Sequence, residues 1–269
     1  MKIILSKKKL IKFIHNEKNL GFIPTMGAIH LGHISLIKES NKICKKTIVS
    51  IFVNKPQFSK KNDFVKYPRV IKRDISILKK SKVNYLYIPQ VKEIYPTGIN
   101  KKIKINPFSK QLCGKFRPGH FKAVVDVIDR FLKIIKPKKI FFGEKDMQQL
   151  KIVHDFIKKN HPRTIVIGCE TIREKNGIAF SSRNVLLSEK EKKIAGKIYK
   201  LLLSKKVSII NKKISLNSVN KKILKFGVRK IDYLKLIDIN KLITPYIKRN
   251  KYKIFIAYYL KKTRLIDNI

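Results

Sequence analysis

Two histidines stand three residues apart where a short apolar segment meets a helical pattern. In the stretch PTMGAIHLGHISLI, residues 24–37, these are His30 and His33, and the whole chain has only 6 histidines. Gly27 and Gly32 keep bulky side chains away from the backbone, which lets a ligand approach closely. Unpaired N–H groups at a helix start attract phosphate, and helical side chains three residues apart face the same way. The spacing therefore predicts a phosphate site whose imidazoles stabilise negative charge that grows during a displacement.

This histidine turn differs from the common phosphate loops. The chain contains neither the GxGxxG signature of dinucleotide-binding proteins nor the GxxxxGK[ST] signature of P-loop proteins. Two histidines at this spacing can also simply cap a helix, and the stretch by itself leaves both interpretations open. The choice depends on the elements that position the turn and on the motifs found elsewhere.

Strand and helix patterns alternate through the first two thirds of the chain. Short apolar or β-branched runs predict strands over residues 20–25, 47–53, 85–89, 139–143 and 164–172. Helical periodicity predicts helices over residues 32–46, 69–80, 120–136 and 147–160. Strands separated by helices of this length favour βαβ units in a parallel sheet with helices on both faces. We therefore expect an α/β fold with a Rossmann-like, doubly wound parallel sheet.

A different pattern begins after about Ile172. Ser188 and Glu191 form a capping box for a helix that runs through Leu203, and a second helical stretch spans residues 216–226. The last third then predicts strands over residues 232–239, 252–260 and 264–269. We expect a Rossmann-like domain over residues 1–172 and a smaller C-terminal α+β domain over residues 173–269.

The formal net charge of +47 raises the hypothesis of a nucleic-acid-binding protein. Only 10 of the 64 basic residues are arginine, the residue that recognises bases and phosphates with two parallel hydrogen bonds. The lysines are also scattered along the chain instead of forming one stripe. We therefore expect weak, salt-dependent attraction to polyanions and no specific nucleic-acid partner.

Cysteine and hydropathy patterns point to the cytoplasm. Cys44, Cys113 and Cys169 are widely spaced and form no CxxC pair, so neither a disulfide framework nor a zinc site is expected. No stretch approaches the roughly 20 apolar residues of a membrane-spanning helix. The N-terminal segment MKIILSKKKL is interrupted by lysines and lacks the apolar core of a signal peptide. We expect a cytoplasmic protein without a membrane partner.

Further motifs support the phosphate interpretation of the histidine turn. They are VSIFVNKPQF (49–58), YPR (67–69), KEIYPTG (92–98), RPGHF (117–121), FGEKDMQQL (142–150), SSRN (181–184) and RLIDN (264–268). Together with residues 24–37, and in this order, they closely resemble the pantothenate synthetase (pantoate–β-alanine ligase) family. That family belongs to the nucleotidyltransferase-like adenylating enzymes that carry an HxGH motif.

The resemblance implies an activity. It implies ATP-dependent condensation of (R)-pantoate with β-alanine to pantothenate, AMP and pyrophosphate, through an enzyme-bound pantoyl adenylate. Mg²⁺ would accompany ATP, and the family is usually a homodimer. Two alternatives stay open: another HxGH nucleotidyltransferase, which would lack the paired context of Gln57 and Gln149, and a basic nucleic-acid-binding protein.

The resemblance also implies roles for residues that match the family motifs. His33 corresponds to the catalytic acid, His30 to a phosphate contact, and Lys145 to the cation that neutralises the transferring phosphate. Gln57 resembles a glutamine shared by pantoate and β-alanine, Gln149 a second pantoate-binding amide and Asn54 a polar neighbour, while Asp74 would help to hold Mg²⁺. The ATP contacts would be Met26, Gly27, Ala28, Ile29, His30, Leu31, Gly32, His33, Gly143, Glu144, Lys145, Asp146, Ile172, Phe180, Ser181, Ser182 and Arg183.

Three positions depart from the family pattern. Cys113 replaces a common glutamate, Pro56 lies one place later than usual, and Asn176 replaces an aspartate. None of these departures changes His33, Lys145, Gln149 or Arg183, so we interpret them as drift around an intact site. His120, in the RPGHF motif, belongs to a loop that is expected to close over the site.

Overall fold

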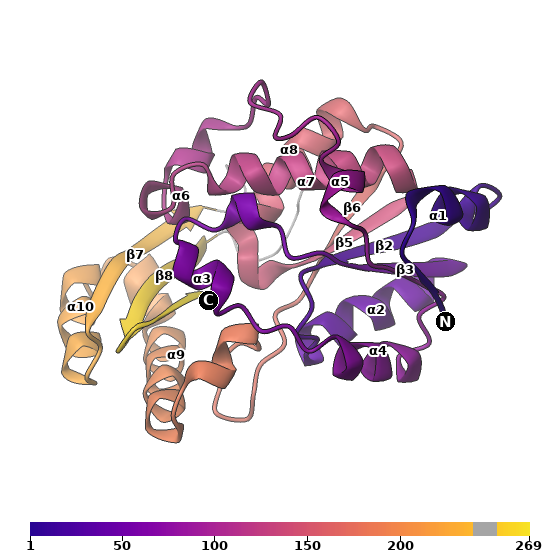
Figure 1. Cartoon of the computed structure of the whole chain (residues 1–269). Helices are drawn as coiled ribbons and strands as arrows, with labels where there is room; N and C mark the ends of the chain where they lie inside the picture. Colours follow the sequence, from indigo (N-terminus) through magenta and orange to yellow (C-terminus); the bar gives the residue numbers. More distant parts are fainter. Residues whose placement is uncertain (239–251) are drawn as a thin grey trace. The chain divides into compact units, whose positions relative to one another are not determined.

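The computed structural model describes residues 1–238 and 252–269, which group into two units (Figure 1). Unit 1 comprises residues 1–144 and 148–170, and unit 2 comprises residues 145–147 and 171–269. The last residue of the predicted strand over 232–239 lies outside the described residues. Among the described residues, no helix is long and apolar enough to cross a membrane.

A six-stranded parallel sheet forms the centre of unit 1, as the alternating pattern predicts. Its spatial order is β1-β4-β3-β2-β5-β6, and every neighbouring pair is parallel. The strands are β1 (Lys2–Ile4), β2 (Leu20–Thr25), β3 (Lys46–Ile51), β4 (Tyr85–Tyr87), β5 (Lys139–Gly143) and β6 (Ile165–Cys169). The chain leaves β2 toward β3 on one side and later returns to pair β5 on the other side. Ligands of such sheets bind beyond the carboxyl ends of the strands at this reversal point, where the histidine turn begins.

Helices cover both faces of this sheet, with α2 and α4 on one face and α7 on the other (Figure 1). Successive residues of β2 point to opposite faces of the sheet. Ile23 lies in one apolar cluster with residues of α2 and α4, whereas Phe22 packs against Phe131 of α7. The helices of unit 1 are α1 (Lys7–Ile14), α2 (Leu31–Ile43), α3 (Lys61–Val65), α4 (Ile71–Lys80), α5 (Val91–Ile94), α6 (Cys113–Phe116), α7 (His120–Ile135) and α8 (Met147–Asn160, whose first residue groups with unit 2). Short 3₁₀ helices are η1 (Lys55–Gln57), η2 (Pro107–Lys110) and η3 (Glu144–Asp146).

Several element boundaries differ from the sequence prediction. The helix predicted over 32–46 ends at Ile43, because Lys46 already pairs with Leu20 in the sheet. The strand predicted over 164–172 is shorter, Ile165–Cys169. The sequence prediction missed β1 and α1, since β1 has three residues and α1 buries only Leu10 and Ile14. Elements this short leave little periodicity to detect.

The described residues of unit 2 form two helices and a three-stranded antiparallel sheet, which confirms the predicted α+β character. The helices are α9 (Glu189–Ile210) and α10 (Leu216–Lys225), after the 3₁₀ helix η4 (Ser182–Leu186); the strands are β7 (Lys230–Asp238), β8 (Tyr252–Leu260) and β9 (Thr263–Asn268). The predicted capping box is present, because the Ser188 hydroxyl accepts from the Glu191 N–H and the Glu191 carboxylate accepts from the Ser188 N–H. The helix that it starts continues past the predicted end at Leu203, since Ile209 is also buried in the unit 2 core.

Candidate active site

The histidine turn follows a backbone route that a buried carboxylate fixes. After β2 ends at Thr25, Gly27 (φ 81°) and Ala28 (φ 51°) both adopt left-handed conformations. Asp74 of α4 is 1% exposed, and its two oxygens accept from the Ala28 and Ile29 N–H groups, each at 2.8 Å. A Cβ on Gly27 would lie 2.9 Å from Asp74 Oδ2, so only glycine fits there without displacement. Asp74 therefore holds the turn in place before any ligand is bound.

Both histidines help to start α2, and this capping sets their proton positions. His30 is the N-cap residue, and its Nδ1 accepts from the Gly32 N–H at 3.1 Å. His33 Nδ1 accepts from the His30 N–H at 3.4 Å, and the two ring centroids lie 4.0 Å apart. A neutral imidazole that accepts through Nδ1 carries its proton on Nε2. Helix capping and phosphate binding are therefore compatible, since capping turns both rings into Nε2–H donors.

The predicted substrate glutamine Gln57 lies beside the histidine turn. Its Nε2 is 2.9 Å from Met26 Sδ, so the structure brings together a predicted ATP contact and a predicted substrate contact. Asn54, which precedes η1, is 1% exposed and donates from Nδ2 to Gln57 Oε1 at 3.1 Å. Pro56, which is displaced relative to the family pattern, fits within η1.

The RPGHF segment holds the backbone of Gln57. His120 Nδ1 lies 2.7 Å from the Gln57 carbonyl oxygen, and Arg117 donates to the same oxygen at 3.2 Å. His120 is 7% exposed at the start of α7. These contacts assign the segment a supporting role at the predicted substrate glutamine, and closure of the loop over the site stays a prediction.

The two neighbouring glutamines of the FGEKDMQQL motif have different environments. Gln148 is buried; its Oε1 accepts from the Cys113 N–H, and its Nε2 donates to the carbonyls of Phe108 and Gln111. Gln149 is half-buried, and its side chain has no hydrogen-bond partner among the described residues. Gln148 is therefore a structural amide, whereas Gln149, the predicted pantoate ligand, keeps its amide for other contacts.

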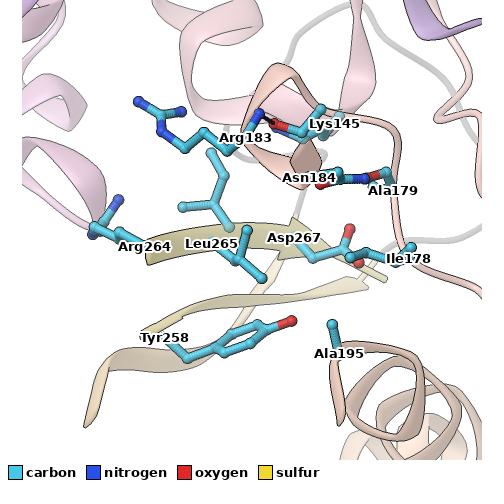
Figure 2. Close-up of a pocket in the computed structure, with 12 residues that line it drawn as sticks. Lys145, Ile178, Ala179, Arg183, Asn184, Ala195, Tyr258, Arg264, Leu265 and Asp267 are labelled. Carbon is cyan, nitrogen blue, oxygen red and sulfur yellow. Dashed lines mark hydrogen bonds between the residues drawn. The ribbon is translucent and has the colours of Figure 1, made fainter. Parts of the chain in front are cut away.

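Unit 2 brings together several other predicted ATP contacts around a small cavity of about 20 Å³, shown in Figure 2. Lys145, Ser181 and Arg183 line it together with Arg264 and Asp267. Ser181 caps η4, because its Oγ accepts from the Arg183 N–H at 3.2 Å. Two other predicted contacts are backbone neighbours, since the Phe180 N–H donates to the Ile172 carbonyl.

Lys145 is anchored through its backbone. Asn268 of β9 donates from Nδ2 to the Lys145 carbonyl oxygen at 2.8 Å, while its Oδ1 accepts from Lys253 Nζ at 2.9 Å. The Lys145 ammonium lies 3.3 Å from Asp146 Oδ1, and the Asp146 side chain is 46% exposed. The Lys145 side chain is itself 18% exposed, and this single contact at 3.3 Å leaves donors of the ammonium for other partners.

The residues that surround Asp74 do not favour a metal ion there. Both of its oxygens accept backbone hydrogen bonds, and the side chain is buried. Among the described residues, no group of three or more His, Cys, Asp or Glu could hold a metal. The predicted role of Asp74 as an Mg²⁺ ligand stays a prediction that this geometry does not support.

Three supporting residues were missed by sequence reasoning. The Tyr95 hydroxyl donates to Asn54 Oδ1 at 2.8 Å. The motifs KEIYPTG, RPGHF and RLIDN contain Tyr95, Arg117 and Asn268, but they indicated no role for these three residues. A short-range pattern has no means of showing that Asn268 contacts a residue 123 positions away. The motifs themselves were the only signal in the sequence.

Comparisons with known proteins match the whole chain. The sequence profile of the pantoate–β-alanine ligase family matches residues 2–269. A pantothenate synthetase from Sulfurihydrogenibium is 40% identical over 273 residues, covering 99% of this chain and 95% of that protein. One from Endomicrobium trichonymphae is 41% identical over 278 residues, covering 100% and 97%.

Solved structures agree with these sequence matches. Pantothenate synthetase from Thermus thermophilus superposes with a TM-score of 0.88 at 31% identity, covering 100% of this chain and 99% of that one. Pantoate–β-alanine ligase from Francisella tularensis, in a complex with beta-gamma ATP and β-alanine, gives a TM-score of 0.87 at 37% identity, covering 100% and 97%. The resemblance found in the sequence motifs is confirmed over the full length.

Proposed function

Because this chain belongs to the pantoate–β-alanine ligase family, we propose that it makes pantothenate in two steps through an enzyme-bound pantoyl adenylate. Membership assigns it ATP-dependent synthesis of pantothenate. In the first step a pantoate carboxylate oxygen attacks the α-phosphorus of ATP, and the bond to pyrophosphate breaks. In the second step the β-alanine amine attacks the acyl carbonyl, AMP leaves, and the nitrogen loses a proton.

The capped histidine pair carries this proposal for the first step. His30 and His33 each have Nδ1 engaged as an acceptor, which places the N–H donor on Nε2. Donors held in position stabilise charge on a phosphate without reorganising during the reaction. His33 acts as the catalytic acid and His30 as a phosphate contact.

The proposed substrate contacts are amides. Gln57 contacts both pantoate and β-alanine, and Gln149 binds pantoate from the first turns of α8. The half-buried, unpartnered side chain of Gln149 within the described structure supports this role. Asn54 orients Gln57 through the hydrogen bond at 3.1 Å.

Unit 2 supplies the proposed cationic contacts to ATP. Lys145 neutralises charge on the transferring phosphate and on pyrophosphate, and Arg183 with Ser181 and Ser182 binds the phosphates. Lys145, Ser181 and Arg183 line one cavity, which supports this part of the proposal. Ser182 does not line that cavity. Residues 173–269 would act as a lid domain on an ATP- and pantoate-binding domain over residues 1–172.

Further parts of the proposal rest on the family resemblance. Mg²⁺ accompanies ATP, and it binds mainly to phosphates and water, as this ion commonly does. The protein is a homodimer in the cytoplasm. The free thiols of Cys44, Cys113 and Cys169 are compatible with that compartment.

Pyrophosphate release measured against a panel of carboxylic acids tests the proposed function. We expect release that depends on pantoate, with AMP and pantothenate formed only when β-alanine is added. An acid other than pantoate that supports faster release would make the chain a different HxGH adenylating enzyme.

A further inference from the structure

Tyr95 begins a chain of three hydrogen-bonded side chains that leads to Gln57. The Tyr95 hydroxyl donates to Asn54 Oδ1 at 2.8 Å, and Asn54 Nδ2 donates to Gln57 Oε1 at 3.1 Å. Gln57 Nε2 in turn points toward the histidine turn, 2.9 Å from Met26 Sδ. A thioether is a weak acceptor, so an incoming substrate oxygen can replace it.

The direction of this chain is set by one backbone carbonyl. Asn54 Nδ2 lies 3.2 Å from the Ala123 carbonyl oxygen, which can only accept a hydrogen bond. Turning the Asn54 amide over would place two acceptor oxygens against each other in a buried site. The Asn54 amide therefore keeps its NH₂ group toward Ala123 and Gln57. Gln57 must then accept this hydrogen bond with its side-chain oxygen. The Gln57 NH₂ group is then the one that can donate a hydrogen bond to a substrate.

Tyr95 completes the arrangement by satisfying the buried oxygen of Asn54. Asn54 is 1% exposed, so its Oδ1 has no access to bulk water. Burial raises the pKa of Tyr95, and the charge of Asp126 raises it further, so the hydroxyl remains protonated and donates. Without this donor, the Asn54 amide would lose one of the hydrogen bonds that fix the orientation of its side chain.

Arg130 fixes the position of Tyr95. Its guanidinium lies 4.5 Å from the centre of the Tyr95 ring, and it donates to the carbonyls of Ile94 and Gly98 on either side. Asp126 accepts from Arg130 Nε at 2.6 Å and holds the guanidinium in turn. The tyrosine ring is therefore clamped by contacts that do not include the substrate site.

From these contacts we propose that Tyr95 is a positioning residue that makes Gln57 present an N–H donor to pantoate. The proposal rests on the proposed function, in which Gln57 contacts pantoate. The site then selects for an oxygen acceptor at that point, such as a hydroxyl or carboxylate oxygen of a hydroxy acid. A glutamine free to turn over would present either group and would select less strongly.

Tyr95→Phe tests the proposal, and Tyr87→Phe is its matched control. Tyr87 is also buried, and its ring packs against Phe131, but its hydroxyl has no hydrogen-bond partner in the described structure. We expect Tyr95→Phe to raise the KM for pantoate about 10-fold, the scale of one lost buried hydrogen bond, with the KM for ATP within twofold. Tyr87→Phe should leave both constants within twofold.

The same substitution in a Gln57→Ala background separates positioning from a general structural effect. If Tyr95 acts through Gln57, Tyr95→Phe should change the pantoate KM by less than twofold once the amide is gone. A tenfold effect that persists there would overturn the proposal, as would equal changes in the KM values for pantoate and ATP. An unchanged pantoate KM in Tyr95→Phe, with a raised one in Gln57→Ala, would reject the positioning role and leave the proposed function intact. An unchanged pantoate KM in Gln57→Ala would instead reject both the substrate contact and the proposal built on it.

Discussion

The residues proposed to contact phosphate in unit 1, in the histidine turn, and in unit 2 are held in place to different degrees. In the turn, Asp74 fixes the backbone at Ala28 and Ile29, and helix capping fixes both imidazoles. In unit 2, Lys145 is anchored at its backbone, and the Arg183 side chain has no hydrogen bond or ion pair among the described residues. The first set of groups is therefore held by several hydrogen bonds, whereas the second consists of long side chains with few contacts.

This difference has an energetic consequence. Ordering a flexible side chain on binding costs about 0.5–1.5 kcal/mol each. The histidine turn avoids that cost because the fold has already positioned its donors. Long cations, in contrast, can follow a phosphate whose position changes as pyrophosphate leaves. The proposed roles differ accordingly: fixed donors for the histidine turn, and adjustable cations for unit 2.

The largest effect in unit 2 is expected for Lys145→Ala. Loss of this cation should lower the rate of pantoyl adenylate formation by about 10²–10³-fold, the scale for removing one group that stabilises transition-state charge. Rapid-quench measurement of adenylate provides the rate. Lys158→Ala, at the exposed end of α8, makes the same charge change and should stay within twofold. Equal effects of the two substitutions would mean that general charge, not position, matters.

A smaller effect on rate but a clear effect on stability is expected for Asp74→Asn. Asparagine offers one acceptor oxygen, so one of the Ala28 and Ile29 N–H groups would lose its partner. A buried unsatisfied donor costs about 1–3 kcal/mol, which equilibrium unfolding in urea should detect, and turnover should fall about 10-fold as the turn loosens.

Asp63→Asn is the control for this substitution, because Asp63 is exposed on α3. It should leave the free energy of unfolding and turnover unchanged. Raising Mg²⁺ tests the alternative role of Asp74. Recovery of Asp74→Asn activity at high Mg²⁺ would favour metal ligation over support of the turn.

The smallest effect is expected at Cys113, where the family commonly has glutamate. Cys113 is 5% exposed in unit 1, and its N–H donates to Gln148. This contact uses the backbone, which Cys113→Ser retains, so turnover should stay within a few-fold. A loss of about 10²-fold in steady-state turnover, the scale of a missing acid–base group, would show that the thiol takes part in catalysis.

Local pattern accounts for those parts of the fold and the site that depend on neighbouring residues. The strand over 139–143 and the helix over 147–160 were predicted with the bounds that the structure has. The first is a short apolar run of high strand propensity, and the second spans several helical turns. The HxGH turn was predicted because its glycines and histidines lie within one short segment. The roles of these residues stay predictions, whereas their contacts are now defined.

Contacts between distant residues account for what the sequence did not reveal. Asp74 reaches a backbone N–H 46 positions away, and Tyr95 reaches an amide 41 positions away. Such pairs come together only when helices and loops pack on the sheet. The family resemblance singled out Asp74 for a different role, and Tyr95 lay in the KEIYPTG motif without any role. Supporting residues of a site are therefore harder to predict from one sequence than the residues that they support.

The central claim is that the capped histidine pair stabilises phosphate transfer, and His33→Ala tests it most directly. Adenylate formation in a single turnover should fall by about 10²–10³-fold, while ready-made pantoyl adenylate should still react with β-alanine, slowed by less. Circular dichroism that matches the parent protein would show that the fold is retained. A folded His33→Ala variant that forms adenylate at the parental rate would make His33 only a helix cap and would contradict the mechanism.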